Sequence, residues 1–190
     1  MPDVILGIDP GSRNTGIAVL SKKEQHWVAI HCETLNISGT EDHAERLKEI
    51  FDHVSEVIQQ HKPTQCAVET PIYGVDPLAM LKLGRAQAAA MLAAQSKGIE
   101  VFEYYPKEVK KSITGNGNAS KVQVAFMLEK TIQLPNKKLS KDATDALAVA
   151  WCHGMSKGGI PKASGKTHQN NKKSDWKSFI ESNPDRVKKS

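Results

Sequence analysis

The pattern of hydrophobic and polar positions divides this chain into short apolar runs and longer segments with helical spacing. Residues 4–8 form an apolar run that ends at Asp9, a Pro-Gly turn follows, and β-favouring residues resume at 16–20. A third strand-like run covers 27–35. Because consecutive strands joined by short turns usually pair with each other, we predict an antiparallel meander of three strands at the start of the fold.

Helical spacing begins after the meander. Apolar residues recur at intervals of three and four from Thr40, the expected N-cap, to the residue before Pro63. Residues 65–69 are again a short apolar run that ends on a carboxylate, Glu69. A buried strand that closes on an acidic residue is therefore predicted twice.

The second half of the chain alternates between helices and strands. The expected elements are an alanine-rich helix from Asp76 to Gly98, a strand at 101–104, a helical turn from Pro106, a loop at 114–120, and helices that begin at Ser120 and Ser140. The smooth face of the alanine-rich helix indicates close packing, within the chain or between subunits. This order predicts an α/β fold, with a mixed sheet whose later strands are parallel and whose faces carry helices.

The net charge of +5 is unevenly distributed. Residues 156–190 hold nine Lys or Arg and three Asp or Glu, a net charge of +6, which leaves −1 for residues 1–155. We expect one folded domain at 1–157 and a basic tail at 158–190 that is disordered in solution. A basic tail can hold phosphates, and a purely solubilising role is an equal alternative.

Neither export nor membrane insertion is expected. The first residues lack a basic segment ahead of a long apolar run, and no apolar run reaches the length of a membrane span. Cys32, Cys66 and Cys152 are odd in number and lack the paired spacing of a zinc site. We predict a soluble, cytoplasmic protein whose cysteines are reduced core thiols.

Asp9 and Glu69 are the first candidate functional residues. Ionising an acid at the end of a core strand costs desolvation free energy unless a cation or hydrogen-bond donors compensate for it. Judged from this stretch alone, Asp9 is explained equally well as a turn aspartate whose side chain hydrogen-bonds its own backbone. If the two strands are neighbours, both carboxylates meet at one edge of the sheet.

The last predicted helix adds two further acids. Asp142 and Asp145 are three positions apart near its start, so their side chains share one face. One explanation is that the positive end of the helix dipole stabilises both acids there. The other is that they bind a divalent cation together with Asp9 and Glu69. Four carboxylates without His or Cys form a hard oxygen-ligand site, suited to Mg²⁺ or Mn²⁺. Two such ions typically serve phosphodiester hydrolysis.

Several motifs together resemble one protein family. ILGIDPGSRNTG, VET, LKLGRAQ, FEYYPKEVKKSITGNGNASKVQV and DATDALAVA occur in this order and resemble the bacterial RuvC Holliday-junction resolvases. The resemblance implies a ribonuclease H-like fold and a homodimer that makes two symmetric nicks in a four-way DNA junction, in recombination and repair. It also implies a branch-migration helicase complex as a partner.

The resemblance assigns the four acids one role. Asp9, Glu69, Asp142 and Asp145 match the catalytic metal ligands of the family. The expected cofactor is Mg²⁺, with two ions in each active site and Mn²⁺ as a substitute.

The same resemblance assigns DNA contacts. Lys110 and Lys121 match lysines placed near the DNA backbone, although on sequence alone both are ordinary solvated lysines at helix starts. Ile72 stands where members often have an aromatic residue, and Tyr73 follows it. Either of these two side chains is a candidate for contact with bases at the crossover.

Two other classes of protein remain open from the sequence. A ribonuclease H-like nuclease acting on RNA precursors can share the turn after Asp9, and would prefer single-stranded RNA to four-way DNA. A junction-binding module without catalysis would not need the acids. Cleavage that depends on divalent cations separates an enzyme from such a module.

Overall fold

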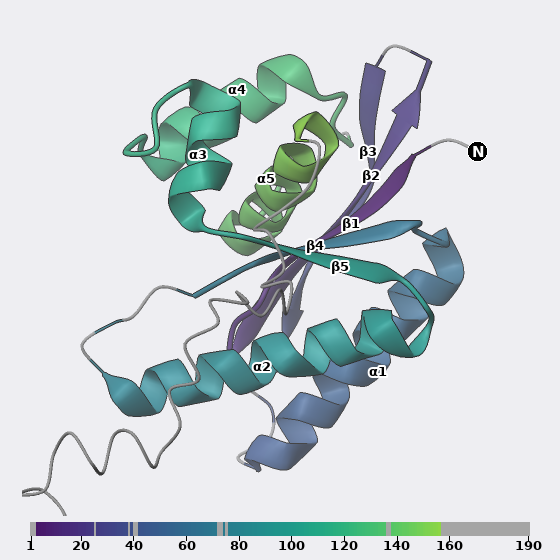
Figure 1. Cartoon of the computed structure of the whole chain (residues 1–190), viewed down its shortest axis with the longest axis vertical. Coiled ribbons are helices and arrows are strands. Elements are labelled where there is room, and N and C mark those ends of the chain that lie inside the picture. Colours follow the sequence, from purple (N-terminus) through teal and green to yellow (C-terminus); the bar gives the residue numbers. More distant parts are fainter. Residues whose placement is uncertain are drawn as a thin grey trace, which may run out of the picture. The chain divides into compact units, whose positions relative to one another are not determined.

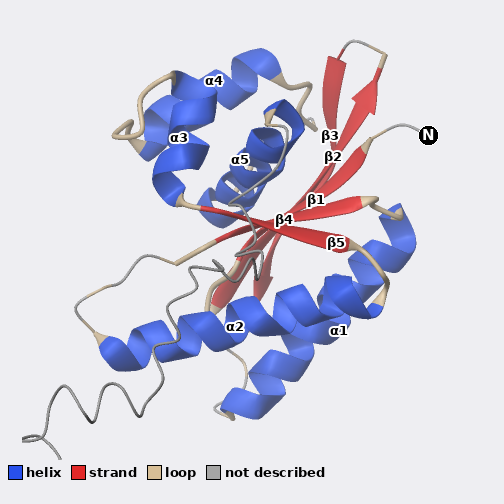
Figure 2. Ribbon diagram, viewed as in Figure 1, coloured by secondary structure: helices blue, strands red, loops and turns tan. Residues whose placement is uncertain are grey.

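The computed structural model describes residues 3–24, 26–37, 39, 42–71, 74, 76–135 and 138–156. Within them, a five-stranded sheet in the order β3-β2-β1-β4-β5 lies between two groups of helices (Figures 1 and 2). The strands are β1 (Val4–Asp9), β2 (Asn14–Lys23), β3 (His26–Asn36), β4 (Gln65–Glu69) and β5 (Glu100–Tyr104). The helices are α1 (His43–His61), α2 (Pro77–Ser96), α3 (Pro106–Thr114), α4 (Lys121–Thr131) and α5 (Lys141–Met155).

The sheet is mixed, as predicted. β1, β2 and β3 form the antiparallel meander, in which Asp9 is opposite Gly16 and Gly16 is opposite Thr34. β4 pairs with β1 in parallel, and β5 pairs with β4 in parallel. Parallel neighbours need a crossover connection, and the chain uses α1 and α2 for this purpose.

One face of the sheet is covered by α1 and α2. Alternation along β1 places Leu6 and Ile8 on this face, where they join Ile50 and Val54 of α1 in a buried core. Five alanines of α2 lie inside the same core: Ala86, Ala89, Ala90, Ala93 and Ala94. The smooth face of α2 is therefore used within the chain.

The opposite face carries α5, with α3 and α4 beyond it (Figure 1). The backbone of α5 lies directly on β1 and β2 at two glycines. A Cβ atom added at Gly7 would stand 2.2 Å from the carbonyl oxygen of Ala146, and one at Gly16 would stand 2.0 Å from that of Asp142. This close approach requires glycine at both positions because any side chain would collide with helix backbone.

The helix starts agree with the sequence except in one case. Asp76, Ser120 and Ser140 are N-caps as predicted. The prediction of Thr40 as the cap of α1 is wrong: the Asp42 carboxylate accepts hydrogen bonds from the backbone N–H groups of Ala44 and Glu45 instead. Two acceptable capping residues lie close together there, and the sequence alone does not rank them.

The remaining expectations concern the cysteines, membrane insertion, and segments outside the described residues. Cys32, Cys66 and Cys152 are all buried, which confirms the prediction that these cysteines belong to the core. Among the described residues no helix combines the length and apolar character needed to cross a membrane. The predicted basic tail at 158–190 lies outside the described residues, as do Ile72 and Tyr73.

Candidate active site

Asp9 and Glu69 end neighbouring strands at the same edge of the sheet. β1 and β4 run in parallel with Ile8 opposite Val68, so the next residue of each strand is the acid. Ile8 and Val68 belong to the core beneath α1 and α2. Because successive side chains alternate between faces, Asp9 and Glu69 point to the face that carries α5.

The turn after Asp9 is closed by another residue. The hydroxyl of Thr15, which is fully buried, donates to the Gly11 carbonyl oxygen at 3.1 Å. The Gly11 N–H donates to Thr15 Oγ1 at 3.4 Å. Thr15 thus supplies the local bond that an aspartate turn would otherwise need, and the carboxylate of Asp9 is available for the site.

The N-terminus of α5 is fixed beside this turn. Ser140 Oγ accepts from the backbone N–H of Ala143 and shares a hydrogen bond of 2.5 Å with the hydroxyl of Thr34 on β3. The contact of Asp142 with Gly16, the cross-strand partner of Asp9, holds the first turn of the helix on the sheet. No sequence signal singled out Thr34, because its partner is distant in the chain.

The four acids are close enough for their charges to interact, and we call Asp9, Glu69, Asp142 and Asp145 the carboxylate cluster. Burial, followed by the negative charge of Asp145, raises the pKa of Asp9 to about 7, and Asp142 adds to this effect. Burial, followed by the charges of Asp9 and Asp145, raises the pKa of Glu69 to about 8. Ionising Asp9 and Glu69 is therefore unfavourable unless a cation compensates for their charge.

Two lysines oppose that charge in part. Lys121 Nζ lies 2.5 Å from Asp145 Oδ2, and this hydrogen bond raises the pKa of the lysine. The positive charges of Lys121 and Lys110 both favour ionised Glu69. The structure thus pairs Lys121 with an acid of the carboxylate cluster, and the charge of Lys110 acts on Glu69. The resemblance had implied only that both lysines lie near the DNA backbone.

The cluster borders a pocket of about 250 Å³. Its lining residues are Asp9, Pro10, Glu69, Pro71, Leu83 and Pro106. In the described part of the chain, no three His, Cys, Asp or Glu side chains already surround a common point as metal ligands do. The ammonium group of Lys121 takes one oxygen of Asp145. The donor set consists of carboxylate oxygens, which fit hard divalent cations.

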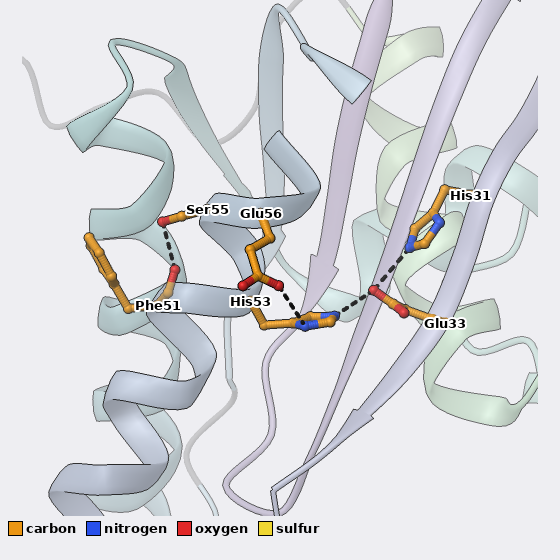
Figure 3. A network of polar contacts seen from close by, with 6 residues as sticks. All are labelled: His31, Glu33, Phe51, His53, Ser55 and Glu56. Carbon is orange, nitrogen blue, oxygen red and sulfur yellow. Dashed lines mark hydrogen bonds and ion pairs between the residues drawn. The ribbon is translucent and has the colours of Figure 1, made fainter. Parts of the chain in front are cut away.

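A separate group of ionisable side chains lies on the face of the sheet that α1 covers. We call it the histidine cluster, and it consists of His31, Glu33, His53 and Glu56 (Figure 3). Glu33 Oε1 is 2.9 Å from His31 Nε2 and 2.7 Å from His53 Nε2. Burial would raise the pKa of Glu33, but the hydrogen bonds and charges of the two histidines outweigh it and lower that pKa. No sequence signal singled out this cluster.

The chain matches one known protein family over most of its length. Residues 5–153 match the family described as crossover junction endodeoxyribonuclease RuvC. The RuvC protein of Salinibacter ruber is 47% identical over 187 residues, which cover 97% of this chain and 98% of that protein.

Solved structures with a similar fold belong to Holliday-junction resolvases as well. RuvC of Thermus thermophilus, in complex with a Holliday junction substrate, has a TM-score of 0.74 and 32% identity over 80% of this chain and 93% of its own. The yeast mitochondrial resolvase Ydc2 shares the fold, with a TM-score of 0.63 and 16% identity over 80% of this chain and 77% of its own. The predicted ribonuclease H-like fold is confirmed, and the chain belongs to the RuvC family of crossover junction endodeoxyribonucleases.

Proposed function

We propose that this chain is a structure-selective endonuclease that resolves four-way (Holliday) DNA junctions by two symmetric, metal-dependent nicks, in homologous recombination and DNA repair. The carboxylate cluster carries the proposal, because burial and mutual repulsion raise the pKa of Asp9 and of Glu69 beside an open pocket. Membership of the family and the Thermus thermophilus relative bound to junction DNA support the choice of substrate.

The four acids are the proposed catalytic residues. Asp9, Glu69, Asp142 and Asp145 would hold two Mg²⁺ ions, for which Mn²⁺ can substitute. Such ions, when bound, supply a more acidic water and positive charge at the scissile phosphate. The protein would hold the carboxylates in place before DNA binds. Two of them stand at strand ends, and the other two lie on α5, whose backbone packs against glycines of the sheet.

The lysines of the site have a proposed role in binding. Lys121 acts as an internal cation at Asp145, and a divalent ion that takes this oxygen would free the ammonium group for a DNA phosphate. Lys110 would contact the DNA backbone beside Glu69. These contacts position the scissile strand and read no sequence, because phosphates are common to all nucleotides.

Two proposals concern residues outside the described ranges. Ile72 and Tyr73 follow Glu69 by three and four positions, so they would lie beside whatever substrate is cut there. Tyr73 would stack on a base at the crossover, or Ile72 would act as an apolar wedge. The tail at 158–190 would add a basic arm to the nuclease domain at 1–157, and its removal should flatten the salt dependence of binding.

We propose a homodimer because the substrate has two strands to cut. Five alanines of α2 pack inside the chain. The outer side of this helix exposes Leu78, Leu81 and Leu92, which are 59%, 50% and 61% exposed. Their spacing places them along one stripe of the helix. This stripe is the proposed contact with a second copy. A branch-migration helicase complex is the further proposed partner, and the cytoplasm the proposed location.

The decisive experiment uses a synthetic four-way junction. With Mg²⁺ the protein should make two nicks at symmetric positions, and with a chelator it should bind the junction without cutting it. Single-stranded RNA and linear duplex DNA serve as competing substrates in the same assay. Junction binding without cleavage under any divalent ion would favour a binding module, and preferred cleavage of RNA would favour the RNA-processing alternative.

A further inference from the structure

Glu103 is an acid near the active site that the proposed mechanism does not use. It lies on β5, where Val101 belongs to the core beneath α1 and α2 and Tyr104 belongs to the core on the other side. Alternation along the strand therefore points Glu103 toward α2, away from the face where Asp9 and Glu69 project. It is behind the carboxylate cluster and is not a member of it.

One oxygen of this side chain joins three elements. Glu103 Oε2 accepts a hydrogen bond from the hydroxyl of Thr70 at 3.1 Å and another from Nε2 of Gln87 at 3.0 Å. Thr70 directly follows β4, Gln87 lies on α2, and Glu103 belongs to β5. Only 9% of Gln87 is exposed, so its amide has little access to water as a substitute partner.

The same residues adjoin the walls of the active-site pocket. Thr70 lies between Glu69 and Pro71, both of which line the pocket. Gln87 is one helical turn after Leu83, another lining residue. The backbone N–H of Thr70 donates to the Tyr104 carbonyl oxygen at 2.9 Å, so the end of β4 is tied to β5 by both backbone and side chain.

We infer that Glu103 is a positioning residue, which fixes Glu69 and the pocket walls at Pro71 and Leu83 through its hydrogen bonds to Thr70 and Gln87. The inference rests on the proposed function, since it assigns Glu103 a part in the same reaction. A metal ligand at a strand end keeps its geometry only if the backbone beyond it is held, and Thr70 is the first residue beyond Glu69. Glu103 supplies that hold without contacting substrate.

The test measures position and chemistry separately in the full chain. In Glu103→Ala, the rate of single-turnover cleavage at saturating protein should fall roughly 10- to 100-fold, as for other residues that orient metal ligands. Affinity for the junction with Ca²⁺ in place of Mg²⁺ should stay close to the parental value. The amide of Thr70 should exchange its hydrogen faster, and Mn²⁺ should bind more weakly when titrated without DNA.

Two further variants and a control sharpen the result. Glu103→Gln keeps an oxygen that accepts both hydrogen bonds and should retain most of the parental rate. Thr70→Val removes one bond at nearly constant volume, leaves Gln87 paired, and should have a smaller effect than Glu103→Ala. Glu100→Ala, at the exposed far end of the same strand, should cut like the parent.

Three outcomes would overturn the inference. The first is parental cleavage and parental Thr70 exchange in Glu103→Ala. The second is a Glu103→Gln protein as slow as Glu103→Ala, because charge and not hydrogen bonding would then matter. The third is a loss of cleavage that only parallels losses of junction affinity and melting temperature in Glu103→Ala and Thr70→Val. If the parent itself fails to cut, the proposed function fails, and Thr70 exchange with Mn²⁺ affinity still decides the role of Glu103.

Discussion

The carboxylate cluster and the histidine cluster are two groups of partly buried acids on opposite faces of one sheet, and their charges are balanced differently. Glu33 has His31 and His53 within 2.9 Å, and its pKa is lowered. Burial and neighbouring acids instead raise the pKa of Asp9 and of Glu69. In the first cluster the protein provides hydrogen-bond partners for the ionised acid, and in the second cluster burial and neighbouring acids make ionisation unfavourable.

This difference distinguishes a structural polar cluster from a site built for a ligand. An acid whose partners are present in the fold adds to stability and needs nothing else. A cluster in which acids raise one another's pKa costs stability, and a cation from outside can relieve that cost. Variants of each cluster should therefore respond differently in cleavage and in stability.

Neutralising the carboxylate cluster should abolish cleavage. Asp9→Asn, Glu69→Gln, Asp142→Asn and Asp145→Asn should each lower the single-turnover rate by about 1,000-fold or more, since each removes a proposed metal ligand. Junction affinity should change little because phosphate contacts remain. Glu33→Gln is the matched control and should cut normally. Substantial cleavage by Asp9→Asn or Glu69→Gln would refute the metal-site interpretation.

The contact of α5 with the sheet should be the most sensitive packing feature near the site. Gly16→Ala would place a methyl group 2.0 Å from the Asp142 carbonyl oxygen, so we expect a loss of about 3 kcal/mol in the free energy of unfolding, measured with urea. Cleavage should fall too, because Asp142 must move.

Gly84→Ala in α2 serves as the control for that substitution, since a Cβ atom there meets no heavy atom within 4 Å. It should stabilise the protein by roughly 0.5 to 1 kcal/mol, because alanine is the better helix former. Equal effects at the two glycines would show that the contact at Gly16 is not special.

The two clusters should respond to pH with opposite sign. In the metal-free protein, the raised pKa values of Asp9 and Glu69 mean that the folded state keeps protons which the unfolded chain releases above its ordinary values of 3.8 and 4.5. Stability from this source should fall as pH rises from about 4 to about 8. Asp9→Asn should thus be more stable than the parent at pH 8 by roughly 1 to 3 kcal/mol, and the difference should shrink toward pH 4.

Glu33 should show the reverse. Its lowered pKa contributes stability above the ordinary value of 4.5, which is lost as pH falls through the lowered pKa. Glu33→Gln should therefore be less stable than the parent at pH 7 and approach it toward pH 3. Urea titrations across this range check both variants, and slopes of the same sign for the two would contradict the comparison.

The smallest effect should come from the histidine cluster itself. His53→Ala removes the 2.7 Å contact with Glu33 and should cost about 1 kcal/mol of stability, because the pair is partly exposed to solvent. Cleavage should not change. His26→Ala, at the exposed start of β3, is the control for removing a histidine. Slower cleavage by His53→Ala alone would give this cluster a part in function.

The local features of this protein can be predicted from its amino-acid sequence. Apolar runs predicted the strands, and the acids that close two of them predicted the carboxylates at the sheet edge. Capping residues located the helix starts at Asp76, Ser120 and Ser140. These features depend on neighbours a few positions away, which is why periodicity and turn chemistry reveal them. The cap of α1 was misplaced because two suitable residues compete within one turn.

Which distant side chains meet depends on how the elements pack, and the sequence pattern does not predict it. Thr34 and Ser140 are 106 positions apart, Thr70 and Glu103 are 33 apart, and Lys121 and Asp145 are 24 apart. Such contacts follow from how close α5 lies on the sheet and which face each strand residue takes, and local propensity does not encode either. The charge balance that separates the two acid clusters is set in the same way, because burial and partners exist only once the elements have packed.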